Sequence, residues 1–189
     1  GGFDAFDSPN FPYLGVAGVN IDIQTELLLP IPPANTPLTV SVLQKSPVAA
    51  LRLFPGISAD VVANMLKPPI RGVVVETYGL GNAPTDNKKL LKVLKAAVDK
   101  GVVIVNCTQC QKGRVQMESY ATGHALKRIG MVSGQDMTAE AALTKMFYLF
   151  GCKLSPERIK KLMSENLKGE LTPTMRTGYL DSNASAFVL

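Results

Sequence analysis

The stretch RGVVVETYGLGNAPTDNKKLLKVLKAAVDKGVVIVNCTQC, residues 71–110, decides the fold of this chain. It contains two apolar runs, at 72–77 and 102–106, separated by a glycine-containing loop and a lysine-rich segment. Both runs are rich in β-branched residues and carry no alternation of polar and apolar positions, which indicates strands buried on both faces. The stretch therefore predicts a strand, a helix and a second strand parallel to the first.

The segment between the two strands has the pattern of an amphipathic helix. Its apolar residues recur at i, i+1, i+4, i+7 and i+8 with lysines on the opposite side, and Gly101 ends the pattern. The candidate caps of its first turn are Thr85, Asp86 and Asn87. The apolar positions are Leu90, Leu91, Leu94, Ala97 and Val98.

Further elements lie on both sides of this unit. The upstream ones are a strand at 38–44, a strand at 50–54 closed by Pro55 and Gly56, and a helix capped by Ser58. The downstream ones are a helix at 118–130 weakened by Gly123, a short edge strand at 131–134, a helix after Thr138, and a helix from Ser155 to Leu167 ended by Gly169. Repeated strand and helix units predict an α/β fold, with a small parallel sheet flanked by helices in three layers, as in Rossmann-like and flavodoxin-like domains.

The chain divides by composition into three parts. Residues 1–37 carry six prolines and little periodicity, so they read as a linker with one short strand near 19–23. Residues 38–171 hold the periodic elements and form the predicted α/β domain. Residues 172–189 have turn residues without periodicity and read as a loose tail.

Bulk composition limits the partners and the compartment. The chain has 189 residues and a formal charge of +5, but its lysines are spread along two helical segments, which is typical of a solvated face. It has no Trp and no basic run interleaved with aromatics, so we expect no nucleic-acid partner. No stretch is long and apolar enough to span a membrane, and three cysteines favour a reducing, cytoplasmic setting.

Two loops follow the strands where ligands gather on a parallel sheet, TYGLGNAP and CTQCQKGRV. In the first, Gly79 and Gly81 permit positive φ and close backbone approach, and Asn82 offers both a donor and an acceptor. The alternative is that the glycines only turn the chain and Asn82 caps the next helix. Neither a phosphate-binding loop nor a complete dinucleotide fingerprint is present, so no cofactor is expected.

The cysteines and the single histidine form no convincing catalytic or metal site. Cys107 and Cys110 make a CxxC pair without a second ligand pair, and His124 lies in a helical segment, so we expect buried or half-buried free thiols and no metal. Among the acidic residues, Asp86 and Glu140 suit helix starts and Asp136 suits a turn. The acid with a possible role in a site is Glu118, which lies with Tyr120 just after the second loop.

The motifs YGLGNAP, VNCTQC, GRVQMESYATGHAL and SGQDMTAEAALTK occur in this order from residue 78 to 145. With the upstream FDAFDSPNFPYLGVAGVNI and the downstream LKGELTP, they closely resemble the C-terminal domain of cytosolic, type I-like L-asparaginases, over most of residues 3–173. The resemblance implies an amidohydrolase that converts L-asparagine to L-aspartate and ammonia as a homodimer or homotetramer. The family's N-terminal domain, which carries the threonine nucleophile, has no motif here, so no catalytic residue is expected in this chain.

The resemblance also assigns roles to particular residues. Asn82, with Gly81 beside it, and Tyr120 would complete the substrate pocket of a neighbouring subunit. Some bacterial members bind asparagine at an allosteric site through an arginine and a cysteine. The cysteine matches Cys110, but Glu76 stands at the arginine position and could not pair with a carboxylate, which puts that site in doubt.

Two other functions stay open from the sequence. One is a non-catalytic module that binds an amino acid or mediates dimerisation. The other is the asparaginase-like subunit of a tRNA-dependent amidotransferase. The motif sequences NCTQC and YATGHAL, however, resemble those of an asparaginase that acts without tRNA more closely.

Overall fold

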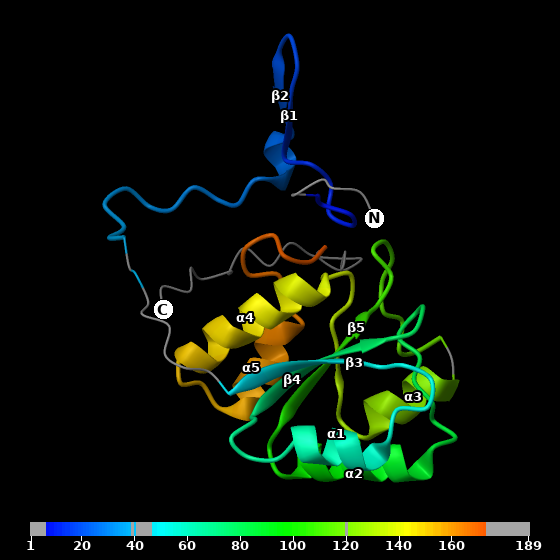
Figure 1. The fold of residues 1–189 in the computed structure, drawn as a ribbon. Coiled ribbons are helices and arrows are strands. Elements are labelled where there is room, and N and C mark those ends of the chain that lie inside the picture. The colour runs from blue at the N-terminus through cyan, green and yellow to red at the C-terminus, as the bar shows by residue number, and fades with distance from the viewer. Residues whose placement is uncertain (1–6, 39, 41–46, 120, 173–189) are drawn as a thin grey trace.

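The computed structural model describes residues 7–38, 40, 47–119 and 121–172 of the chain (Figure 1). In chain order its elements are β1 (Gly15–Ala17), β2 (Ile21–Ile23), the 3₁₀ turn Thr25–Leu27, β3 (Val48–Arg52), α1 (Ala59–Met65), β4 (Gly72–Thr77), α2 (Lys88–Asp99), β5 (Val103–Thr108), α3 (Ala121–Arg128), β6 (Val132–Ser133), α4 (Ala139–Gly151) and α5 (Pro156–Met163).

The main sheet has four parallel strands in the order β3-β4-β5-β6. The two central strands are those that open and close the stretch at 71–110, and every residue of β5 is buried. Because both faces of a parallel sheet are covered by helices, these strands can be apolar along their whole length. The predicted short strand at 131–134 is confirmed as β6, which pairs with β5 at one edge of the sheet that the described residues form.

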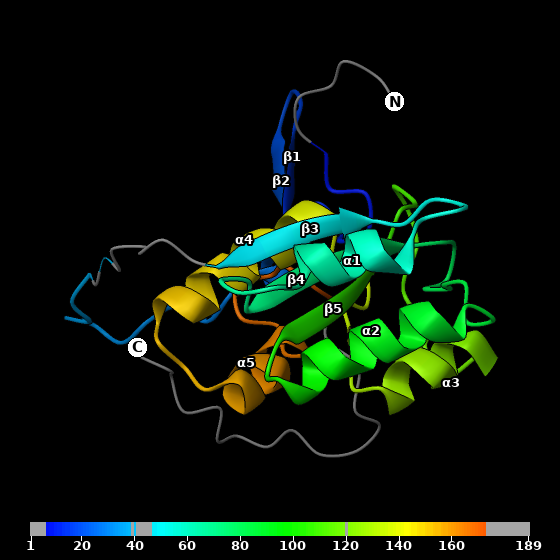
Figure 2. The ribbon, with the colours of Figure 1, turned by 60° about the horizontal axis from the view of Figure 1, so that its bottom comes forward.

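The sheet lies between two layers of helices, with α1, α2 and α3 on one face and α4 and α5 on the other (Figures 1 and 2). Alternate residues of each strand serve the two layers. Val73, Val75 and Ile104 join the core against α1 to α3, whereas Val74 and Val105 join the core against α4 and α5. The predicted three-layer α/β architecture is therefore confirmed.

The predicted helix starts are also present. Ser58, Thr138 and Ser155 each accept a backbone N–H through the side-chain oxygen at the first turn of their helix. Of the three candidates before α2, Asn87 is the cap, because its Oδ1 accepts from Leu90 N at 3.0 Å. Gly101 ends α2 with a φ of 87°.

Two predicted elements differ in the structure. The single strand expected near 19–23 is one arm of an antiparallel hairpin, in which β2 pairs with β1. The last helix ends at Met163 and does not reach Leu167. After Met163 the bonds tighten, with Ser164 N donating to Lys161 O and Glu165 N to Leu162 O. Farther on, the carboxylate of Glu170 accepts from the backbone N–H of Leu167 and Lys168, so these groups are not part of a helical ladder.

The remaining boundaries stay predictions. Most of the strand expected at 38–44 lies outside the described residues, and so does the tail from 173 onward. The described residues contain no helix that could cross a membrane.

Candidate functional site

The loop after β4 is a closed turn at the carboxyl edge of the sheet. Tyr78 N donates to Asn82 O and Asn82 N donates to Tyr78 O, both at 2.8 Å. Gly79 and Gly81 have φ values of 49° and 100°, a region that suits glycine. A Cβ on Gly81 would also lie 2.6 Å from Val115 Cγ1, so this position needs glycine for both space and backbone geometry.

Buried polar side chains of β4 and β5 form hydrogen bonds that hold the glycine loop in place. Asn106 in β5 donates from Nδ2 to Gly81 O at 3.0 Å and accepts from Thr77 Oγ1 at 2.6 Å. Thr108, at the end of the same strand, donates from Oγ1 to Gly79 O at 2.5 Å. Since hydrogen-bonded buried polar groups specify one arrangement, the loop is a preformed feature of the sheet edge.

The side chain of Asn82 is oriented by helix α3. Thr122 Oγ1 donates to Asn82 Oδ1. Gly123 lets this helix lie against the segment that precedes it, because a Cβ at this position would lie 2.5 Å from Met117 O. Among the described residues no hydrogen bond engages Asn82 Nδ2, so the amide N–H groups remain as donors for a ligand.

The two cysteines of the CxxC motif have different environments. All three cysteines are free. The prediction of a buried or half-buried free thiol is confirmed for Cys107 and is wrong for Cys110, because the loop after β5 leaves that residue exposed. Cys107 is buried, and burial raises the pKa of its thiol to about 12, which makes it a poor nucleophile. Cys110 is exposed, and its backbone N–H donates to Thr108 Oγ1 at 3.0 Å. Within the described residues no group of His, Cys, Asp or Glu could hold a metal ion.

Glu76, at the position where the resemblance would place arginine, pairs with a neighbouring strand. Arg52 NH1 lies 3.1 Å from Glu76 Oε2, and the two residues are register partners in β3 and β4. A guanidinium is therefore present at this strand end, but Glu76 already neutralises it. The Arg52 guanidinium is therefore not free to bind a ligand carboxylate beside Glu76 and Cys110, the two allosteric candidates.

The acidic candidates have the structural positions that the sequence suggests. Asp86 accepts from Asn87 N before α2, and Glu140 lies in the first turn of α4. Asp136 accepts from Thr172 N at 3.0 Å and so holds the end of the domain. His124 is exposed on α3, as expected for a helix-surface residue.

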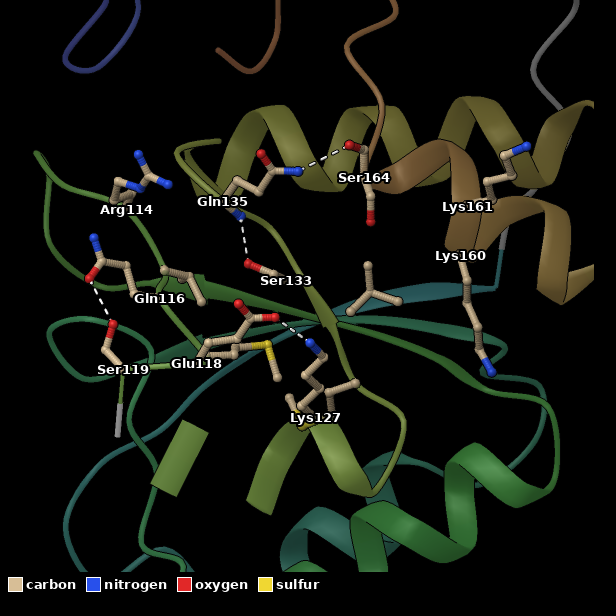
Figure 3. A pocket seen from close by; sticks show the side chains of 14 residues that line it. Arg114, Gln116, Glu118, Ser119, Lys127, Ser133, Gln135, Lys160, Lys161 and Ser164 are labelled. Carbon is tan, nitrogen blue, oxygen red and sulfur yellow. Dashed lines mark hydrogen bonds and ion pairs between the residues drawn. The ribbon is translucent and has the colours of Figure 1, made fainter. Parts of the chain in front are cut away.

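Glu118 lies beside a groove at the β6 edge of the sheet, and Tyr120 lies outside the described residues. The hydrogen bond and charge of Lys127 lower the pKa of Glu118 below its usual value. The groove has a volume of about 800 Å³, and several cationic side chains line it together with apolar ones (Figure 3). Its rim residues include Arg114, Gln116, Glu118, Lys127, Gln135, Lys160 and Lys161.

One segment connects this groove with the glycine loop. Residues 115–117 line the groove, while Gln116 N donates to Leu80 O at 2.9 Å. Asn82 itself does not line the groove. The structure therefore separates the two sequence candidates: Asn82 belongs to the glycine loop, whereas Glu118 belongs to the β6 edge.

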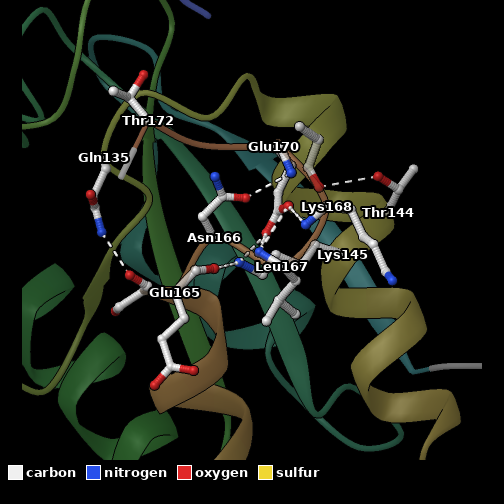
Figure 4. Close-up of polar contacts among 12 residues, drawn as sticks. Gln135, Thr144, Lys145, Glu165, Asn166, Leu167, Lys168, Glu170 and Thr172 are labelled. Carbon is white, nitrogen blue, oxygen red and sulfur yellow. Dashed lines mark hydrogen bonds and ion pairs between the residues drawn. The ribbon is translucent and has the colours of Figure 1, made fainter. Parts of the chain in front are cut away.

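A buried ion pair holds the segment after α5 against α4 (Figure 4). Lys145 of α4 lies 2.6 Å from Glu170, and the side chains are 5% and 15% exposed. Lys145 also donates to Glu165 O. Burial lowers the pKa of Lys145 although Glu170 opposes this shift, and burial would raise the pKa of Glu170 but hydrogen bonds from Lys145 and the backbone lower it overall.

Sequence reasoning missed three polar residues that organise these features. Asn106 and Thr122 fix the loop and its amide, and Lys145 fixes the segment after α5. A signal existed for Asn106, because a polar residue inside a fully apolar strand requires partners. Thr122 and Lys145 gave no such signal, since both occur in helices where polar residues are ordinary.

A family model for the glutaminase/asparaginase C-terminal domain matches residues 47–163. L-asparaginase 1 of Escherichia coli K12 is 48% identical over 173 residues, which are 91% of this chain and 50% of that protein. The human 60 kDa lysophospholipase is 44% identical over 90% of this chain and 30% of its own length. A component of the glutamyl-tRNA(Gln) amidotransferase of Pyrococcus furiosus is 36% identical over 67% of this chain and 28% of its own length.

The solved structures include a similar fold. The crystal structure of L-asparaginase I from Vibrio cholerae matches with a TM-score of 0.81 and 44% identity, over 89% of this chain and 50% of that one. The chain thus spans at most about half the length of these relatives.

Proposed function

The chain belongs to the glutaminase/asparaginase C-terminal domain family, and from this premise we propose that it is the C-terminal part of an L-asparaginase that hydrolyses L-asparagine to L-aspartate and ammonia. In this proposal the preceding half of the enzyme supplies the nucleophile, and this chain completes the substrate pocket of a neighbouring subunit. The enzyme is cytoplasmic, needs no cofactor, and is a homodimer or homotetramer.

The observation that carries the proposal is the preformed glycine loop with its oriented amide. Thr122 Oγ1 donates to Asn82 Oδ1, so the N–H groups of the Asn82 amide can donate to a ligand. Such donors suit a carboxylate, and asparagine carries one at its α-carbon. We propose that Asn82 binds the α-carboxylate of asparagine, with Gly81 keeping the backbone close and Tyr120 lining the same pocket.

The decisive experiment uses a full-length chimera, in which the N-terminal half of E. coli L-asparaginase 1 is fused ahead of residue 1. The chimera should release ammonia from asparagine, whereas the 189-residue chain alone should not. Robust hydrolysis by the chain alone would contradict the division of roles, and an inactive, folded chimera would contradict the function itself.

Substitutions then test the loop within the chimera. Asn82→Ala should lower kcat/KM at least about tenfold, equivalent to about 1.4 kcal/mol, without lowering Tm. Thr122→Val should also lower kcat/KM because it frees the amide to rotate, and Thr122→Ser should retain it. Unchanged kinetics in both Asn82→Ala and Thr122→Val would return the loop to a purely structural turn.

Two alternative functions remain from the sequence: the amidotransferase subunit and the non-catalytic module. The similarity to an amidotransferase component favours an amidase that serves a tRNA-dependent enzyme. Such an enzyme would hydrolyse its amide donor slowly without the partner subunit and its charged tRNA, so stimulation by both would favour it over the free hydrolase. Calorimetric titration of the 189-residue chain with asparagine and aspartate tests the other candidate, the non-catalytic module, which requires binding without any upstream half.

A further inference from the structure

The outer edge of β6 is open. β6 pairs with β5 on one side, and no strand of the described residues lies on its other side. An edge strand of this kind presents backbone N–H and C=O groups to whatever lies beside it. The groove of the β6 edge follows these groups, because Val132 and Ser133, the two residues of β6, both line it.

The hydrogen bonds around β6 identify which backbone groups face the groove. Gly134 N donates to Asn106 O of β5 at 2.8 Å. Successive residues of a strand direct their backbone groups to opposite sides, so the N–H and C=O of Ser133 point away from β5. Gln135 O, two residues farther on, also points away and accepts from Val115 N at 2.7 Å. Within the described part of the chain, no hydrogen bond occupies the outward groups of Ser133.

Cationic side chains line both walls of the groove. One wall comes from α3 and the loop before it, and the other comes from α5 (Figure 3). Glu118 is the one carboxylate among the described lining residues, and it is paired with Lys127. The cationic lining residues are Arg114, Lys127, Lys160 and Lys161.

Three of these cations can bind an added anion. Neither Arg114 nor Lys160 has an ion pair with another described residue. The pair of Lys161 is loose, because its Nζ lies 4.0 Å from Glu165 Oε1 and its side chain is 67% exposed. The groove therefore combines an open strand edge with a net positive charge, which complements an extended chain that carries acidic side chains.

We propose that the β6 edge binds an acidic peptide segment of a partner protein, which adds as a strand beside Ser133 and places carboxylates against Arg114, Lys160 and Lys161. The backbone bonds to Ser133 hold the segment extended, and the cations select its acidic side chains. A second copy of this chain fits less well, because the same cationic walls would face each other. A nucleic acid fits less well too, because its phosphates would use the cations and leave the strand edge unpaired.

Fluorescence anisotropy with a short labelled peptide that alternates glutamate and valine tests the proposal on the 189-residue chain. The peptide should bind, and binding should weaken as the salt concentration rises. The double substitution Lys160→Gln with Lys161→Gln should raise Kd at least about tenfold. Lys88→Gln with Lys92→Gln is the matched control, because it makes the same change of net charge on exposed residues of α2, outside the groove. It should leave Kd within about twofold.

A second pair of variants tests the strand edge. Ser133→Pro removes the outward N–H but keeps the bonds to β5, so it should raise Kd at least about threefold. Ser133→Ala keeps the backbone donor and should bind like the unsubstituted chain. Peptides N-methylated on one or the other set of alternate residues test the same bonds without changing the protein, and one of the two sets should abolish binding. Circular dichroism reports that each variant is folded.

The outcomes decide between an acidic peptide and the other occupants. Failure to bind the peptide, equal weakening by the two lysine pairs, or full binding of both N-methylated peptides would overturn the proposal. Tighter binding of a single-stranded oligonucleotide would overturn it in favour of a nucleic-acid surface, and self-association that Ser133→Pro abolishes would overturn it in favour of a second copy. Binding by the 189-residue chain but not by the chimera would also overturn it, because the upstream half would then cover the edge.

This site is separate from the glycine loop. Neither Gly81 nor Asn82 lines the groove. Peptide binding is therefore independent of whether the chimera releases ammonia, so the failure of one proposal leaves the other standing.

Discussion

The sheet domain at 47–172 and the N-terminal segment at 7–38 use aliphatic residues in opposite ways. In the domain, β4 and β5 place valine and isoleucine between two helical layers, where they are fully buried. In the segment, the same residue types stand in a hairpin and in the stretch after it with most of their surface in water. The difference teaches that the domain closes its own core, whereas the segment contributes no side chain to a core among the described residues.

The sharpest way to break this comparison is to make one substitution in both regions. Ile104→Ala removes a side chain with no exposed surface and should cost about 4 kcal/mol of unfolding free energy, through lost burial and a cavity. Ile21→Ala in the 189-residue chain should cost less than about 0.5 kcal/mol, as for an ordinary surface change. Urea unfolding followed by circular dichroism measures both, and similar losses would mean that the hairpin is packed.

The second prediction concerns the buried ion pair of the domain. Lys145→Met leaves the carboxylate of Glu170 buried without its partner and should cost about 3 kcal/mol. Lys95→Met breaks an exposed pair with Asp99 on α2 and should cost about 0.5 kcal/mol or less, which makes it the matched control. The measurement is again urea unfolding.

A double substitution shows whether the loss comes from the pair. Adding Glu170→Gln to Lys145→Met removes the uncompensated charge and should recover part of the stability. If Lys145→Met behaves like Lys95→Met, the pair does not hold the segment after α5.

The sequence predicted the domain well because its signals are local. The apolar runs, the helical spacing from Leu90 to Val98 and the caps Ser58, Asn87, Thr138 and Ser155 all follow from neighbouring residues. The non-helical course at Leu167 and Lys168 was missed because it is held by Glu170, whose partner Lys145 lies 25 positions upstream in the sequence, in another helix. Contacts of this kind have no periodic signature.

The candidate site was predicted only in outline for the same reason. The glycines and Asn82 marked the loop, since their backbone requirements are local. The buried support from Asn106 and the contact from Thr122 join residues 25 and 40 positions apart, and only the folded sheet brings them together. The hairpin was read as a single strand because residues 15–17 carry no alternation that distinguishes them from the surrounding linker.

The smallest expected effect is the pH dependence that Glu170 gives to the domain and not to the hairpin. Hydrogen bonds lower the pKa of Glu170 below its ordinary value of 4.5, so its stabilisation is complete above about pH 4.5 and is lost as the pH falls through the lowered pKa. Glu170→Gln should therefore reduce stability at pH 7 and flatten the decline between pH 5 and 3. Tm is measured across this pH range for the unsubstituted chain and for the Glu170→Gln variant, and the two slopes of Tm against pH are compared. Parallel curves would show that other carboxylates govern acid unfolding. Exchange at 15–23 in the 189-residue chain, corrected for intrinsic rates, should stay unchanged over the upper part of this range, because no buried carboxylate in the described part of the chain bonds to the hairpin.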